Sequence, residues 1–258
     1  MPPSHPSGAP LDWRRGEQAS DGRTRFPIVK QLTESSYLLS FGGVNAVLLD
    51  GGGELTLIDA GMPGKAGVVW RALEQLGRKR HELRHLVLTH AHSDHIGSAA
   101  EIVRESGCTT YMTAADAPIA RTGGPFRHMC PAPGLFNKVG YRLAWRPSQK
   151  VDPVEIDRII GDGDVLPLAG GLKVIATPGH CAGQVALLWR TDKLLIAGDV
   201  CTNIFGLGDP LGFENIEEGR RSQRKIASLD FDAIAFGHGR PIRTAASSRL
   251  MKKWGPRS

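Results

Sequence analysis

The chain has 258 residues, of which 41% are hydrophobic and 22% charged, and its 32 Lys and Arg residues exceed its 26 Asp and Glu residues by six. These proportions are those of a globular protein, so they exclude a fibrous or a wholly disordered chain. No run of about 18 apolar residues is present, so we expect no membrane-spanning helix and no membrane partner. The basic runs 78–80 and 220–225 lack interleaved aromatic residues, so we expect no nucleic-acid partner either.

Cysteine usage indicates the compartment. Cys108, Cys130, Cys181 and Cys201 form no CxxC pair and give no sign of a disulfide framework, which fits a reducing environment. The N-terminus lacks the apolar core of a signal peptide. We therefore expect a cytoplasmic location.

The order of predicted elements indicates one α/β domain. Residues 1–25 are rich in Pro, Ser, Gly and charge, which predicts a flexible leader before a single domain over 26–258. Strand patterns follow at 37–41, 46–50 and 55–59, then helices are predicted over 63–76 and 96–105, short strands over 164–198, and helices over 215–229 and 245–254. Two runs of strands, each accompanied by helices, predict two sheets packed face to face with helices outside.

The densest functional signal is His90-Ala91-His92-Ser93-Asp94-His95, directly after the strand-like run 86–89. Four potential metal ligands occupy six positions. On an extended segment His90 and His92 point the same way, whereas Asp94 and His95 enter a turn or helix start and can address a neighbouring position. One short segment can therefore serve two metals. The alternative is a solvated polar loop before a helix.

Three further candidates each lie just past an apolar, strand-like run and beside glycine. They are His180 after 172–176, Asp199 after 194–197 and His238 after 233–236. A lone histidine is more often a core or surface residue than a ligand. Three such strand ends together with the 90–95 cluster favour a shared metal site.

The chain resembles the metallo-β-lactamase-fold hydrolases over about residues 26–245, in Leu57-Ile58-Asp59-Ala60-Gly61, the 90–95 motif, Thr177-Pro178-Gly179-His180, Gly198-Asp199 and Gly237-His238-Gly239. The resemblance implies an αβ/βα four-layer sandwich of two mixed β-sheets with helices on the outer faces. It also implies that His90, His92 and His180 hold a first metal, that Asp94, His95 and His238 hold a second, and that Asp199 bridges both. Asp59 occupies the position of an acid that orders the ligands without binding metal; a turn or capping role is the alternative.

By the same resemblance, the expected function is a dinuclear metal-dependent hydrolase. It would attack a small-molecule lactone, ester or thioester with a metal-bridging hydroxide, with Asp94 as proton carrier and two divalent ions, Zn²⁺ first and Fe or Mn as alternatives. Thr202 stands where related lactonases carry Tyr, and about 20 residues after His238 are too few for the helical domain of glyoxalase II. The alternatives are an iron-dependent sulfur dioxygenase-type oxidoreductase, a β-lactam hydrolase and a non-catalytic binding protein.

Two stretches, 118–153 and 201–214, exceed what a minimal fold needs. We hypothesise that both overhang the metal site, the first as a lid insert, and form an apolar wall for substrate. The candidate pocket residues are Phe126, His128, Phe136, Thr202 and Phe205. The alternative is ordinary surface packing or a homodimer contact.

Overall fold

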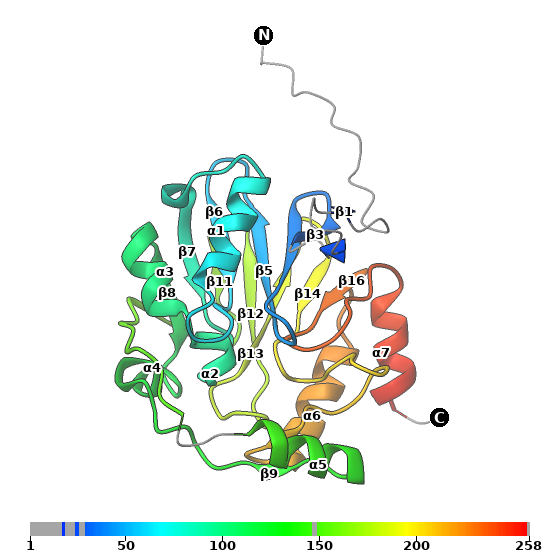
Figure 1. Ribbon diagram of the computed structural model, residues 1–258. Helices are drawn as coiled ribbons and strands as arrows, with labels where there is room; N and C mark the ends of the chain where they lie inside the picture. Colours follow the sequence, from blue (N-terminus) through cyan, green and yellow to red (C-terminus); the bar gives the residue numbers. More distant parts are fainter. Residues whose placement is uncertain (1–16, 19–23, 26–28, 146–148, 257–258) are drawn as a thin grey trace.

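The computed structural model describes residues 17–18, 24–25, 29–145 and 149–256 (Figure 1). Most of the expected leader lies outside these residues. Its described part is an antiparallel pair of short strands, β1 (Glu17–Gln18) and β2 (Thr24–Arg25). No helix in the described ranges is both long enough and apolar enough to cross a bilayer.

The larger sheet has seven strands in the order β10-β8-β7-β6-β5-β4-β3. The neighbours from β10 to β6 run parallel and those from β6 to β3 run antiparallel, so the sheet is mixed. Its strands are β3 (Val29–Thr33), β4 (Ser36–Ser40), β5 (Asn45–Asp50), β6 (Leu55–Ile58), β7 (Leu83–Val87), β8 (Thr109–Thr113) and β10 (Arg158–Ile160).

The smaller sheet has five strands in the order β11-β12-β13-β14-β16. Only β14 and β16 are parallel neighbours, and the other pairs are antiparallel. Its strands are β11 (Val165–Leu166), β12 (Leu172–Ala176), β13 (Val185–Trp189), β14 (Leu194–Ile196) and β16 (Ala233–Ala235).

Side-chain alternation along the strands separates the apolar layers. In β5, Ala46 and Leu48 face a cluster with helices α1 (Ala66–Gln75) and α3 (Ala99–Ser106), whereas Val47 and Leu49 face the other sheet. A third cluster joins the outer face of the smaller sheet to α6 (Ile216–Ala227) and α7 (Ala246–Trp254). Figure 1 shows these two helix pairs flanking the sheets, and the predicted αβ/βα four-layer sandwich is confirmed.

The strands that precede the candidate ligands end at one edge of the two sheets. Strands β6 and β7 are parallel, so their carboxyl ends lie together. The same holds for β14 and β16, and β12 shares their direction because two antiparallel steps separate it from β14. Asn45 joins the sheets at this edge, since its Nδ2 donates to the carbonyl oxygens of Phe236 (3.0 Å) and Gly239 (2.9 Å).

The stretch 118–153 is more ordered than a loop insert. It contains most of α4 (Ala117–Thr122), a short strand β9 (Cys130–Pro131) and the ten-residue helix α5 (Leu135–Ala144). Strand β9 pairs with β15 (Gly212–Phe213), so the two stretches that the sequence left unexplained bind each other. The remaining short helices are η1 (Arg80–Glu82) and α2 (Ser93–Ile96).

Candidate metal centre

Three histidines converge after β7 and β12. The Nδ1 atom of His92 lies 3.1 Å from Nε2 of His90 and 3.0 Å from Nε2 of His180. All three side chains are buried. Tetrahedral zinc with Zn–N bonds of about 2.0–2.1 Å holds its nitrogens roughly 3.3 Å apart, so these atoms are spaced to share one ion. The structure therefore brings together the residues that the sequence assigns to a first metal.

A second group gathers Asp94, His95 and His238. The Oδ2 atom of Asp94 lies 3.2 Å from Nε2 of His238 and 3.9 Å from Nε2 of His95. Asp94 and His95 lie on α2, the short helix that begins after His92. The turn from strand to helix separates their direction from that of His90 and His92, as the spacing predicts.

Asp199 lies between the two groups. Its Oδ2 is 3.5 Å from Nε2 of His180 and 3.3 Å from Nε2 of His238, and its Oδ1 is 3.6 Å from Nε2 of His95. A carboxylate that touches members of both groups is placed to bridge two ions.

Asp59 orients one ligand and the backbone of the next strand end. Its Oδ2 accepts a hydrogen bond from Nδ1 of His95 at 2.8 Å, and its Oδ1 accepts one from the backbone N–H of Thr89 at 2.8 Å. Asp59 itself has a positive φ of 65°, an uncommon conformation for which Asp is one of the better-suited residues. Fixing Nδ1 of His95 as the donor leaves Nε2 directed at the site.

Burial and charge divide the imidazoles into two electrostatic classes. Burial, followed by the nearby imidazoles, lowers the pKa of His90 and His92 well below the usual value, and burial lowers the pKa of His180 as well. For His95, burial alone would lower the pKa, but Asp199, Asp59 and Asp94 together raise it to about 10. The first group is therefore neutral at pH 7, which is the form that binds metal.

Two observations show that the second group fits a bound cation. Nε2 of His95 and Oδ1 of Asp199 are buried and have no hydrogen-bond partner among the described residues. Such atoms are costly to bury without a partner. A Cβ atom on Gly237 would lie 2.1 Å from Oδ1 of Asp199 and 2.7 Å from Cε1 of His95, so only glycine leaves this space open. The donor set and the space both fit a divalent cation.

A buried ion-pair network that the sequence did not predict braces both ligand-bearing turns. Arg127 binds Asp116, whose Oδ2 accepts a hydrogen bond from the backbone N–H of Ala91 at 2.7 Å, between His90 and His92. The Nε atom of Arg127 also donates to Glu214 at 2.8 Å, and Glu214 accepts from the N–H of Ala182 at 2.8 Å, two residues after His180. Sequence spacing gives no signal for this network, because its members come from three separate segments.

A cysteine and two aromatic residues surround His92 of the first group. Sγ of Cys181 lies 3.2 Å from Nε2 and 3.8 Å from Nδ1 of His92. The ring of Trp145 packs edge-on against His92 with centroids 5.0 Å apart, and Tyr141 stacks on Trp145. The imidazole of His92 is therefore held by neighbours on several sides.

The proposed pocket residues occupy different environments. Phe126 is buried with its ring 6.3 Å from that of His92, and His128 is exposed. Thr202 is buried, and its hydroxyl donates to the carbonyl oxygen of Asp209 at 3.2 Å. Phe136 and Phe205 are exposed and contact each other edge-to-face at 5.2 Å.

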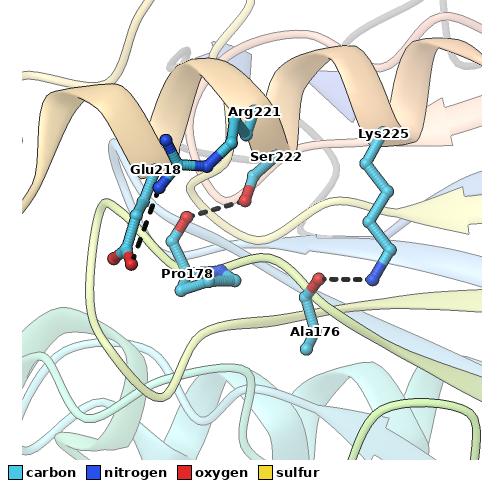
Figure 2. Close-up of a pocket in the computed structure, with 6 residues that line it drawn as sticks. All are labelled: Ala176, Pro178, Glu218, Arg221, Ser222 and Lys225. Atoms are coloured by element: carbon cyan, nitrogen blue, oxygen red, sulfur yellow. Dashed lines mark hydrogen bonds and ion pairs between the residues drawn. The ribbon is translucent and has the colours of Figure 1, made fainter.

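Residues that line a pocket beside α6 hold the turn that carries His180. It is lined by Ala176, Pro178, Glu218, Arg221, Ser222 and Lys225 (Figure 2). Ser222 donates to the carbonyl oxygen of Pro178 at 2.7 Å, and Lys225 donates to that of Ala176 at 3.0 Å. Gly179 lies directly on the helix, since a Cβ there would come within 2.1 Å of the backbone nitrogen of Gly219. These contacts fix the position of the turn relative to α6.

Comparison with known proteins decides the family. The metallo-beta-lactamase superfamily profile matches residues 39–238, well over half of the chain. The chain belongs to the metallo-beta-lactamase superfamily. As a member of it, the protein is a metal-dependent hydrolase, and its cluster of His and Asp residues is a site for divalent metal.

Similarity to individual proteins supports this assignment to the superfamily. "Probable metallo-hydrolase YflN" of Bacillus subtilis is 29% identical over 203 residues, covering 72% of this chain and 75% of that protein. A hydroxyacylglutathione hydrolase of Rhizobium meliloti is 31% identical over 169 residues, covering 64% of this chain, which spans only 52% of that relative. A metallo-beta-lactamase motif mutant from Cronobacter sakazakii superposes with a TM-score of 0.65 at 25% identity, covering 82% of this chain and 80% of its own.

Proposed function

We propose that this superfamily member is a dinuclear hydrolase of small-molecule lactones, esters or thioesters. The observation that carries the proposal is the convergence of seven side chains into two adjoining groups that share Asp199. Nε2 of His95 and Oδ1 of Asp199 are buried without hydrogen-bond partners, and an ion held only by His90, His92 and His180 would leave Nε2 of His95 unsatisfied. This favours two ions over the single iron of a dioxygenase and over a metal-free binding site.

Different residues of the chain have different roles in the proposed reaction. Divalent ions, when bound, supply Lewis acidity and a hydroxide nucleophile at neutral pH. We propose that His90, His92 and His180 hold one ion and that Asp94, His95 and His238 hold the other, with zinc as the preferred metal because the donors are imidazole and carboxylate. Asp59 keeps His95 in the tautomer that offers Nε2.

Asp94 is the proposed proton carrier. Its Oδ2 contacts His238 and His95, no described donor occupies Oδ1, and the side chain is 31% exposed, so Oδ1 can accept a proton from water and pass it to a leaving group. In the overall reaction the water oxygen joins the acyl carbon, the bond from that carbon to oxygen or sulfur breaks, and the departing alcohol or thiol takes a proton. No protein nucleophile is needed.

The acyl class of substrate is supported by the relatives. The hydroxyacylglutathione hydrolase of Rhizobium meliloti matches this chain over 169 residues. Its substrate, as its name states it, is a thioester of glutathione. The solved metallo-beta-lactamases share the fold, so β-lactams belong among the compounds tested as the second candidate class.

The test combines metal analysis with a substrate screen. Purified protein is analysed for zinc, iron and manganese and assayed with lactones, thioesters, esters, phosphoesters and β-lactams, before and after removal of metal by chelation. We expect close to two ions per chain and acyl hydrolysis that zinc restores. His92→Ala should lose both metal and turnover, whereas the matched control His81→Ala, an exposed histidine on η1, should keep both. Undiminished turnover by metal-free protein, or a single iron with oxygen uptake, would rule the proposal out.

A further inference from the structure

Helix α5 presents an apolar face to solvent at the rim of the metal site. Four of its hydrophobic side chains are exposed, Leu135 by 80%, Leu143 by 70%, Phe136 by 60% and Val139 by 49%; these four, with Ile204 and Phe205 from the adjoining loop, are called the α5 face. The Phe136 and Phe205 rings touch, so the helix and the loop form one continuous surface.

The opposite side of α5 explains why the helix holds this orientation. The hydroxyl of Tyr141 donates to the carbonyl oxygen of Met129 at 2.5 Å, Nδ2 of Asn137 donates to that of Pro133 at 2.8 Å, and Gly140 packs against Leu211. The helix is therefore anchored through its more polar side. Burying the apolar side instead would break these contacts, so the outward apolar face is built into the fold.

The charges around α5 indicate which kind of partner would bind the α5 face. Residues 117–151 contain six Lys and Arg and no Asp or Glu. On a helical projection, Lys138 and Arg142 flank the stripe formed by Leu135, Val139 and Leu143. Two acids of the adjoining segment are already engaged, because Glu214 binds Arg127 and Asp209 binds Arg220. The α5 face is thus apolar at its centre and positive along its edge.

The side chains of the α5 face protrude from the surface, which favours a lipid bilayer as the partner. Leu135, Leu143 and Phe205 are 70–83% exposed, so they protrude and do not line a groove. A bilayer interface takes up protruding apolar side chains between its headgroups while anionic lipids meet flanking cations. A second copy of this chain pairing through the same face would bring two sets of cations together, which disfavours self-association.

We propose that the α5 face docks the protein onto anionic lipid surfaces. Peripheral docking needs no spanning helix, so it is compatible with the absence of apolar runs in the sequence. Trp145 follows α5 directly and touches His92, so docking places the edge of the metal site next to the bilayer. The docking itself does not depend on the hydrolytic proposal, and it would bring the site close to acyl compounds dissolved in the membrane.

The experiment is vesicle co-sedimentation of the full chain at low salt. Vesicles of phosphatidylcholine alone are compared with an equimolar mixture of phosphatidylcholine and phosphatidylglycerol. We expect binding to the anionic vesicles, weakened by salt. The double variant Leu135→Glu/Leu143→Glu should lose at least about tenfold in affinity, and Lys138→Gln about fivefold.

Matched controls lie on another exposed helix, α7. Met251 is 43% exposed and Lys252 is exposed, so Met251→Glu and Lys252→Gln make the same chemical changes away from the α5 face and should bind like the unmodified protein. Melting temperature, metal content and turnover of a water-soluble ester should be unchanged in the double variant. Those readouts separate failure of docking from failure of the hydrolase proposal.

Four results would overturn the proposal: no binding to anionic vesicles, equal binding to neutral ones, equal loss in the α7 controls, or a dimer in solution that the double variant converts to monomer. The last would assign the α5 face to a second copy of the chain.

Discussion

The ion-pair network around Arg127 predicts that a residue which touches no metal controls metal affinity. Arg127 contacts Asp116 and Glu214, and each carboxylate in turn accepts a backbone N–H from a ligand-bearing turn. The variant Arg127→Met keeps an unbranched apolar side chain but removes the guanidinium group and its charge. Asp116 and Glu214 then lose their shared cation, and the turns that carry His92 and His180 lose their common link through Arg127.

The expected magnitude follows from burial. Exposed ion pairs contribute about 0–1 kcal/mol, whereas breaking a buried pair costs about 3–5 kcal/mol. Here Asp116 is 0% exposed, Glu214 14% and Arg127 32%, so the pairs lie between these limits. We expect a loss of about 2 kcal/mol in the free energy of unfolding, or roughly 4–8 °C in melting temperature for a chain of this size. Outer contacts that orient ligands change metal affinity by about 10–100-fold, and we expect about tenfold.

The assay measures both quantities on the same protein. Thermal unfolding is followed in the metal-free and zinc-loaded states, and zinc affinity is measured by competition with a chromophoric chelator. Arg221→Met is the matched control, since Arg221 is 63% exposed and its ion pair with Glu218 is long, at 3.8 Å. Arg127→Lys should restore part of the affinity. Unchanged zinc affinity in a destabilised Arg127→Met protein would refute the reasoning, because the network would then stabilise the fold without positioning ligands.

Other predictions test the site more directly. Gly237→Ala should abolish binding of the second ion while retaining the first, because its methyl group would fill the space beside Asp199; two ions per chain in this variant would contradict that account. Asp199→Asn should lose most turnover and lower metal content, as measured by elemental analysis and ester hydrolysis, and full activity would exclude the bridging role. Phe126→Ala should raise KM with little change in kcat, because its buried ring lies 6.3 Å from that of His92, and an unchanged KM would remove Phe126 from the substrate pocket.

The convergence of the strand-end candidates could be predicted because local sequence pattern and strand topology coincide there. His90 and His92 follow β7 by period-two spacing, and the others follow apolar runs that end in glycine. When such strands share a direction, their carboxyl ends meet at one edge, and the ligands converge. The four-layer fold could be predicted for the same reason, since its core strands carry nearly continuous apolar runs.

Residues 118–153 could not be assigned in the same way. Helix α5 has an amphipathic pattern, but its apolar side faces solvent and its anchoring contacts use Tyr141, Asn137 and Gly140, so the usual link between apolar spacing and burial fails. Strand β9 is two residues long, and its partner β15 lies about 80 residues further along the chain. Such short, distant pairing leaves no periodicity for a single sequence to reveal.

Pairing of β9 with β15 also connects the segment that carries α5 to a proposed metal ligand. The carbonyl oxygen of Gly212, in β15, accepts a hydrogen bond from Nδ1 of His180 at 2.8 Å, which directs Nε2 of that ring toward His92. The platform that carries α5 therefore fixes the tautomer of a proposed ligand. A movement of α5 would therefore reach the first group of histidines by two routes: through Gly212, which pairs with β9 and accepts the hydrogen bond from His180, and through Trp145, which packs on His92.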